Sequence, residues 1–352
     1  MARSLFVCFV LSLALLCTQD GLCARGHRGE EFKILSLGGG GVRGVVSLKI
    51  LEFLSQSSSS KTPSPGPINW GEQFDCFAGT STGAIIAVGL SMGMPIDELM
   101  EAYCALSSKV FGHPSWFAIV HPKYHQDQLR EALIEVLSWK FSEPEEVCLN
   151  DLPNRVIIVT VNLEDQHSHR WRMDVKHNLS KEAGESNLVD VLLQTTAAPT
   201  FFASYEHHVD GGMVANDPSL VAFARTYCPY GLDKNGALIL SVGTGSFPRY
   251  ISEDEKWGQA QWLSPFACDS SAGSVPLINM LCDLEEEKPS QLLAKMLPGK
   301  FRKLDVELSK DVALDDASAI PALVKRCDEV FETKKDFWHD ARDWLRAHIR
   351  SS

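Results

Sequence analysis

The sequence predicts an α/β protein with a mainly parallel sheet. Short apolar runs of strand length occur at residues 32–37, 74–78, 155–163 and 237–242. The first two run into glycine-rich turns and then into apolar helical segments, so that strands alternate with helices. With 352 residues, 45% of them hydrophobic and 22% charged, the chain can bury one large core. We therefore expect a single domain with insertions over residues 25–352.

The first 24 residues differ from the rest of the chain. Arg3 precedes an almost unbroken apolar run, Leu5–Leu16, and a short polar stretch then leads to a possible cleavage site near Ala24. The apolar run is too short to span a bilayer comfortably. We interpret residues 1–24 as a signal peptide, which predicts an exported protein, secreted or periplasmic. The alternative is association with a membrane through an uncleaved N-terminus.

The charge and the cysteines exclude several classes of protein. A net charge of −12 argues against a nucleic-acid partner and against electrostatic capture by an anionic membrane, because both need excess Lys and Arg. Three of the ten cysteines lie in the signal segment, and the other seven are dispersed without C-x-x-C spacing. They are more typical of buried thiols than of zinc ligands or a disulfide framework. No metal or organic cofactor is expected.

The first strand–helix unit contains a glycine-rich loop that can bind an anion. Phe32–Leu37 ends in four glycines, and the segment Val45–Leu54 reads as a buried helix. Exposed backbone N–H groups at a helix start stabilise negative charge, such as the oxyanion of acyl transfer. The residues of this candidate oxyanion hole are Gly39, Gly40, Gly41, Val42, Arg43 and Gly44, where Arg43 steadies the loop or meets a lipid phosphate.

The same glycines also fit nucleotide-binding loops in part. Gly39-x-Gly41-x-x-Gly44 matches the dinucleotide pattern, but that site needs an acidic residue about 20 positions on, and residues 57–68 contain none. A Walker loop needs Lys and then Ser or Thr after its last glycine, where this chain has Val45 and Val46. Nucleotide binding and a plain structural turn therefore stay as weaker alternatives.

The second unit carries a candidate nucleophile, Ser81. It lies at the centre of a G-x-S-x-G turn between the run Phe74–Ala78 and the apolar segment Ala84–Ser91. Side chains at the flanking glycines would clash where strand and helix fold back on each other. The residues of this predicted nucleophile elbow are Gly79, Thr80, Ser81, Thr82 and Gly83.

A candidate base follows in the segment Val209–Gly212. A serine hydroxyl needs a neighbouring base to become a good nucleophile. Gly211 and Gly212 would let the backbone of Asp210 approach a second loop closely, although an Asp-Gly-Gly run is as typical of a simple turn. The histidines that a Ser-Asp-His order requires are poorly placed, because only His339 and His348 follow, in a charged helical segment.

Two other histidines, His207 and His208, precede Asp210 and are interpreted as part of a polar turn. The last 25 residues have the pattern of an amphipathic helix packed on the body. Phe111, Trp116 and Phe117 are a candidate apolar lip for lipid docking, although such a cluster more often belongs to a core.

Taken together, the three motifs resemble those of the patatin-like phospholipase family in order and spacing. The similarity extends from about Phe32 to Gly245 and includes the segments 197–200 and 241–245. The resemblance implies a three-layer α/β/α sandwich. It also implies hydrolysis of fatty-acyl esters of membrane lipids through a Ser81–Asp210 dyad and an acyl-enzyme, with transient contact with a membrane surface. The alternative from another class is a non-catalytic protein that binds lipid, an anion or a nucleotide through the glycine loop.

Overall fold

The computed structural model describes residues 31–56, 68–112, 121–164, 169–230, 236–251, 256–263 and 276–349. Seven strands form one sheet in the order β4-β3-β2-β1-β6-β7, and β5 also pairs with β3. Neighbouring strands are parallel except that β4 and β5 run antiparallel to β3. The prediction of a mainly parallel sheet is confirmed. The strands are β1 (Phe32–Leu37), β2 (Cys76–Thr80), β3 (Arg155–Asn162), β4 (Arg172–His177), β5 (His208–Asp210), β6 (Ala237–Val242) and β7 (Phe301–Leu304).

The central strands are apolar on both faces because helices cover both. On β1, Phe32 and Ile34 belong to one core and Leu35 and Leu37 to the other. The larger core packs against α2 (Gly44–Ser55), α4 (Thr82–Ser91), α5 (Ile96–Phe111), α6 (Gln126–Leu137), α7 (Leu188–Thr195), α12 (Ile320–Thr333) and α13 (Lys335–His348). The smaller core packs against α9 (Ser219–Tyr230) and α11 (Pro276–Met296). This is the expected three-layer α/β/α sandwich. Three short helices, α3 (Trp70–Gln73), α8 (Gly212–Ala215) and α10 (Gln259–Trp262), complete the described helices.

Of the four predicted strands, those at 32–37 and 237–242 have the predicted bounds and that at 155–163 ends one residue earlier. The second was misplaced, because β2 begins at Cys76 and continues through Gly79 and Thr80. Those two residues pair with β3, so the strand continues to Thr80 and the turn begins at Ser81. The sequence did not indicate β4, β5 or β7.

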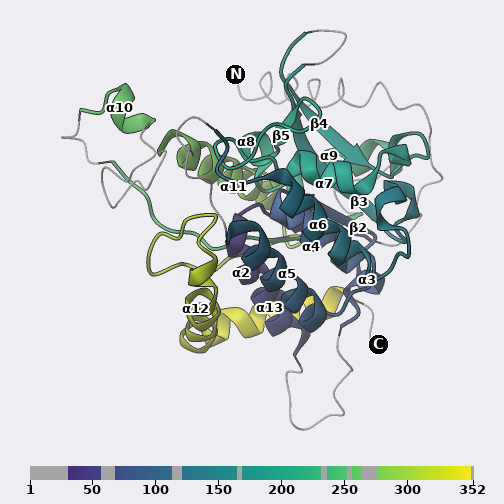
Figure 1. Cartoon of the computed structure of the whole chain (residues 1–352). Helices are drawn as coiled ribbons and strands as arrows, with labels where there is room; N and C mark the ends of the chain where they lie inside the picture. Colours follow the sequence, from purple (N-terminus) through teal and green to yellow (C-terminus); the bar gives the residue numbers. More distant parts are fainter. Residues whose placement is uncertain are drawn as a thin grey trace, which may run out of the picture.

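The C-terminal segment forms two helices where one was expected. The backbone leaves the helical conformation at Lys334, between α12 and α13. Both helices lie beside α2, as the yellow ribbon in Figure 1 shows. Ring centroids of Phe53 on α2 and Phe331 on α12 are 4.6 Å apart, and Trp338 on α13 is 4.7 Å from Phe331. The C-terminus therefore completes the core over α2.

Several sequence predictions concern residues outside the described part. The signal segment 1–24 lies there, as do Trp116 and Phe117 of the candidate lip. Phe111, the third member of that lip, packs against Tyr124 with ring centroids 5.1 Å apart and so contributes to the core. Five cysteines of the described residues, at positions 76, 104, 148, 282 and 327, are free thiols. Among the helices of the described ranges, none has the length and apolarity needed to cross a membrane.

We expect Trp338→Ala to lower the free energy of unfolding by about 3–5 kcal/mol, because the side chain is 1% exposed and its removal leaves a cavity among aromatic rings. Urea denaturation measures the loss. The neighbouring Phe337 is 48% exposed, so Phe337→Ala is a matched control that should cost less than about 1 kcal/mol. Equal losses in both variants would contradict the packing of α13 described above.

Candidate active site

Ser81 lies on a strained turn where β2 meets α4. Its backbone angles are φ 54° and ψ −130°, a conformation that a residue with a side chain adopts only when its surroundings impose it. The Ser81 amide donates a 2.9 Å hydrogen bond to the hydroxyl of Thr195, whose own hydroxyl donates to the carbonyl of Val159. Thr195 thus ties the turn to β3, a role that the sequence did not reveal.

The glycines on either side of Ser81 are required by close backbone approach. A Cβ at Gly79 would lie 2.4 Å from Cα of Ala84, so strand and helix could not fold back. A Cβ at Gly83 would lie 2.3 Å from the carbonyl oxygen of Leu37, at the end of β1. The first clash is the one predicted, whereas the second involves β1 instead of β2.

The two threonines of the turn are both buried. Thr80 donates a 2.7 Å hydrogen bond to the carbonyl of Ala215 on α8, and Thr82 is the first residue of α4. Thr80 therefore anchors the start of the turn both to β3, by strand pairing, and to α8, by this hydrogen bond.

The register of β3 brings Ser81 and Asp210 together. Val159 of β3 pairs with Thr80, the last residue of β2, and Thr160 pairs with Asp210, the last residue of β5. Because β2 runs parallel and β5 antiparallel to β3, the two strands end facing each other along the same side of β3. Ser81, which follows Thr80 directly, therefore meets Asp210, and their side chains are hydrogen-bonded.

The Asp210 carboxylate is buried, with 6% of the residue exposed. Burial raises the pKa of Asp210 to about 6, while hydrogen bonds from the Ser81 hydroxyl and the Gly212 amide act to lower it. The Gly212 bond is 2.7 Å long. A Cβ at Gly211 would lie 2.2 Å from the carbonyl oxygen of Val159, so this glycine allows the close backbone approach to β3. The arrangement places a carboxylate of raised basicity directly on a serine hydroxyl.

His208 does not lie in the turn where it was expected. It is the first residue of β5, it is buried, and its Nε2 lies 3.0 Å from a carboxylate oxygen of Asp174. His207 is in the turn, with a positive φ of 60°, and its side chain is exposed. The serine–aspartate contact is therefore direct, with no imidazole between the two groups.

The glycine-rich loop lies next to Ser81. A Cβ at Gly39 would be 3.1 Å from Cβ of Ser81. The Gly39 amide donates to the Asn216 carbonyl at 3.2 Å, and its carbonyl accepts from the Thr244 hydroxyl at 3.0 Å and from the Asn216 amide at 3.3 Å. Asn216 and Thr244 thus fix the loop, and the sequence did not single out either residue for this role.

Four of the six expected oxyanion donors are already paired. Besides Gly39, the amides of Arg43 and Gly44 donate within the first turn, and the Val42 amide donates to the Leu314 carbonyl at 2.8 Å. The expectation that Val42 holds an oxyanion is therefore corrected. In the described part of the chain, the amides of Gly40 and Gly41 have no such partner, which leaves these two donors available.

Arg43 supports the loop from inside. The residue is 8% exposed and its Nε donates to the Gly40 carbonyl at 3.4 Å. Burial and the nearby Arg249 lower the pKa of Arg43. Of the two roles considered for Arg43, the structure agrees with steadying the loop.

This chain is similar in sequence to one protein family and to several relatives. The model of a family described as patatin-like phospholipase matches residues 35–223. A cGAMP-activated phospholipase of Vibrio cholerae is 27% identical over 323 residues, which cover 83% of this chain and 88% of the relative. A cGAMP-activated phospholipase of Escherichia coli is 30% identical over 60% of this chain and 62% of the relative. Patatin-like protein 4 of Arabidopsis thaliana is 28% identical over 66% of this chain and 65% of its own length.

Solved structures with some likeness include VipD from Legionella pneumophila. Its TM-score is 0.41 at 12% identity, with 96% of this chain and 73% of the other covered.

We expect Asp210→Asn to raise the free energy of unfolding at pH 8, by an amount on the order of 1–3 kcal/mol. The pKa of Asp210 lies above the ordinary value of 3.8, so the folded state holds this proton more tightly than the unfolded state does. The carboxylate therefore costs most stability above about pH 6 and little near pH 4. Urea denaturation at pH 8 and pH 4.5 measures the difference between variant and wild type, which should shrink at the lower pH.

Asp174→Asn is the matched control of opposite sign. The pKa of Asp174 is lowered despite the raising effect of burial, because His208 and Lys176 favour its ionised form. This variant should lose stability at pH 8. A stability loss in Asp210→Asn at that pH would contradict the desolvated carboxylate.

Proposed function

The chain belongs to the patatin-like phospholipase family, and we propose that it is a lipid acyl hydrolase of the phospholipase A type. It cleaves fatty-acyl esters of membrane lipids with Ser81 as nucleophile and Asp210 as base. The observation that carries this proposal is the direct hydrogen bond between the Ser81 hydroxyl, on its strained turn, and the buried Asp210 carboxylate. Phospholipases among the relatives support a lipid as the substrate class.

In the first step, Asp210 takes the hydroxyl proton as Ser81 Oγ attacks the ester carbonyl carbon. A base works best when its pKa lies near the operating pH, so the raised pKa of Asp210 favours this proton transfer over that of an exposed carboxylate. The Ser81–Asp210 contact also holds the nucleophile in position before the substrate arrives, which saves orientational entropy.

Negative charge then develops on the carbonyl oxygen. The amides of Gly40 and Gly41 are the loop donors left for this oxygen, and the bonds from Asn216 and Thr244 to Gly39 keep the adjoining backbone fixed. The intermediate collapses when the ester C–O bond breaks, and Asp210 returns its proton to the departing alcohol. The fatty-acyl group is now an ester of Ser81.

A water molecule completes the cycle. Asp210 takes a proton from this water, whose oxygen attacks the acyl carbon, and the Ser81 ester bond breaks. Ser81 recovers a proton from Asp210 and the fatty acid leaves. The same two residues therefore serve both halves of the reaction.

The alternative of nucleotide binding at the glycine loop has less support. Phosphate loops use several free backbone amides, whereas most amides here donate to protein carbonyls. Titration with a labelled nucleotide distinguishes the two proposals. Saturable binding that Gly40→Ala abolishes, in a protein without esterase activity, would favour the alternative.

We expect Ser81→Ala to abolish fatty-acid release, with a loss of at least about 10³-fold in kcat. A fluorophosphonate probe should label the wild type and leave the variant unlabelled, and mass analysis of a mixed lipid extract identifies what is released. Ser138→Ala, at an exposed serine after α6, is the control and should be labelled like the wild type. Undiminished hydrolysis by Ser81→Ala would exclude the assignment.

The pH dependence should report Asp210. Its protonated form cannot accept the serine proton, so we expect kcat/KM to fall about tenfold per pH unit below about pH 6, where the pKa of Asp210 lies. Initial rates with a soluble ester between pH 4.5 and 6 test this. A flat profile over that range is inconsistent with Asp210 as the base.

For the compartment, we propose export after cleavage of residues 1–24. The proposal rests on the apolar run Leu5–Leu16 behind Arg3. N-terminal sequencing of the protein made in cells with a secretory pathway tests it. A mature protein that still begins at Met1 would favour the uncleaved, membrane-associated alternative.

A further inference from the structure

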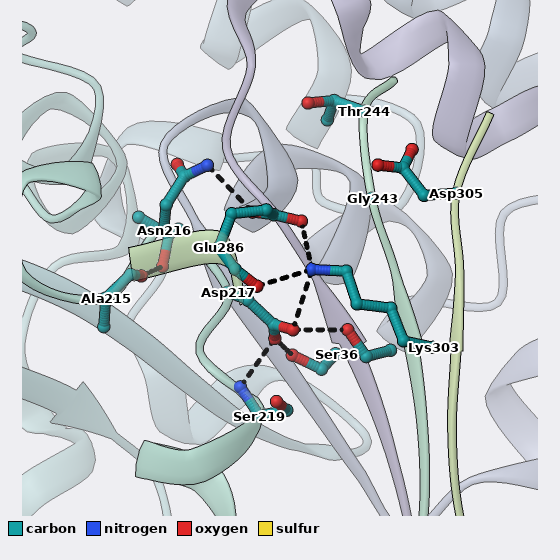
Figure 2. A network of polar contacts seen from close by, with 12 residues as sticks. Ser36, Ala215, Asn216, Asp217, Ser219, Gly243, Thr244, Glu286, Lys303 and Asp305 are labelled. Atoms are coloured by element: carbon teal, nitrogen blue, oxygen red, sulfur yellow. Dashed lines mark hydrogen bonds and ion pairs between the residues drawn. The ribbon is translucent and has the colours of Figure 1, made fainter. Parts of the chain in front are cut away.

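A cluster of charged side chains lies beneath the glycine-rich loop, and two of its three members, Glu286 and Lys303, come after the residues that match the family model. Lys303 of β7 extends its ammonium group to Glu286 of α11, with 2.6 Å to a carboxylate oxygen and 2.7 Å to the backbone carbonyl. The same ammonium is 3.4 Å from Asp217. Figure 2 shows Lys303 between the two carboxylates. The side chains are 17%, 18% and 1% exposed for Lys303, Glu286 and Asp217.

Asp217 anchors this cluster to the sheet. It accepts hydrogen bonds from Ser36 of β1 at 3.0 Å and from Ser241 of β6 at 2.7 Å, and these two serines are register partners. It also accepts from the Ser219 amide at the start of α9. The backbone that precedes Asp217 is therefore held over the ends of β1 and β6, and that backbone carries Asn216.

Asn216 connects the cluster to the catalytic loop. Its Nδ2 donates to Glu286 at 2.9 Å and to the Gly39 carbonyl at 3.3 Å. Its backbone carbonyl accepts from the Gly39 amide. A Cβ at Gly39 would lie only 2.6 Å from Oδ1 of Asn216, so the amide plane and the loop fit closely. The orientation of the Asn216 amide is thus coupled to the position of the loop beside Ser81.

Glu286 and the Gly39 carbonyl together fix the orientation of the Asn216 amide. Its carboxylate accepts from Lys303 with one oxygen and from Asn216 with the other. With both oxygens acting as acceptors, the NH₂ group of Asn216 must face Glu286 and Gly39. The opposite orientation would set a carbonyl oxygen against a carboxylate.

The carboxylate is retained at a cost to stability. Burial raises the pKa of Glu286 to about 7, although Lys303 lowers it, and the neighbouring Asp217 and Asp305 raise it further. Since this value lies above the ordinary 4.5, ionised Glu286 destabilises the folded state above about pH 7. Against the lowering effect of burial, Glu286 also raises the pKa of Lys303, and in a glutamine variant this ammonium would keep Asp217 as its ionised partner.

We propose that Glu286 is a positioning residue, which acts with Lys303 to orient the Asn216 amide and so fixes the Gly39–Gly41 backbone against Ser81. This inference rests on the proposed hydrolase function. It extends the working site into α11 and β7, beyond the residues that carry the family motifs. Glu286 touches neither substrate nor nucleophile and acts through Asn216.

The first test is Glu286→Gln. The carbonyl oxygen of the glutamine should face the charged Lys303. The glutamine NH₂ group then faces the NH₂ group of Asn216, and since both groups are donors, the hydrogen bond between positions 286 and 216 is lost. At pH 8 we expect kcat to fall about 10- to 100-fold with a smaller change in KM, because the loop holds the transition state more than the ground state. The free energy of unfolding at pH 8 should be equal to or higher than that of the wild type. Glu287→Gln, at the exposed next position of α11, is the matched control and should keep wild-type kinetics.

A pH profile separates positioning from a structural role. The charged groups that face Glu286 are Lys303 of β7, Asp217 before α9 and Asp305 after β7. Between pH 8 and about 6.5 the wild-type kcat should decline as Glu286 is protonated, whereas kcat of Glu286→Gln should stay level until Asp210 titrates. A merely structural role predicts parallel profiles and a loss of stability.

Asn216→Ala provides a second variant if Glu286→Gln does not fold. It removes the same connection without changing the charge cluster, so we expect a similar loss of kcat. The double variant should lose little more than either single one, because both changes break one linkage.

The outcomes separate this inference from the proposed function. A wild type that releases no fatty acid and is not labelled at Ser81 refutes the hydrolase. An active wild type together with a Glu286→Gln variant of unchanged kcat and pH profile refutes the positioning role alone. Additive losses in the double variant would also contradict it.

Discussion

The contact between Ser81 and Asp210 depends on the register of strand β3 with its neighbours β2 and β5. Consecutive residues of β3, Val159 and Thr160, pair with the last residue of β2 and the last residue of β5. Two strands that run in opposite directions therefore end against each other, and the residues at that junction are a serine and an aspartate. A shift of β5 by one residue against β3 would turn the Asp210 side chain to the other face of the sheet and move it away from Ser81. Two hydrogen bonds then stabilise this contact. The Ser81 amide donates to the Thr195 hydroxyl, and the Gly212 amide donates to the Asp210 carboxylate.

The residues at and beside this junction destabilise the folded state, so other parts of the molecule must stabilise it. Ser81 has a positive φ, and the Asp210 and Glu286 carboxylates have pKa values raised by burial. Each of these features opposes folding at neutral pH, and each belongs to the proposed active site or to the residues that support it. Compensation comes from the apolar cores on both faces of the sheet, including the aromatic packing of α12 and α13 on α2. The C-terminal helices thus stabilise a fold in which these three features are themselves unfavourable.

The parts that the sequence could predict are those encoded locally. The apolar runs located most of the central strands, and the glycines around Ser81 indicated the turn before any contact was known. Asp210 is different, because β5 has three residues and no recognisable pattern, and its partner β3 lies far away in sequence. The role proposed for Asp210 therefore rests, at the level of sequence, on the family resemblance and on the poor placement of the histidines. The Val42 amide was misassigned for the same reason, since its partner Leu314 belongs to a distant segment with no motif.

Glu286 is an example of a residue whose contacts with a site could not be predicted from the sequence. It lies within a run of three glutamates on α11, and Glu285 and Glu287 pair with Lys288 and Gln291 near the surface, so nothing in composition distinguishes the middle one. Its proposed positioning role depends on contacts made in the folded chain, where β7 places Lys303 and the α8–α9 connection places Asn216 on either side of it. The family match ends at residue 223, before β6, β7 and α11. On the positioning proposal, a substitution at Glu286 or Lys303 therefore changes the rate of the proposed reaction while the serine and aspartate motifs stay unchanged.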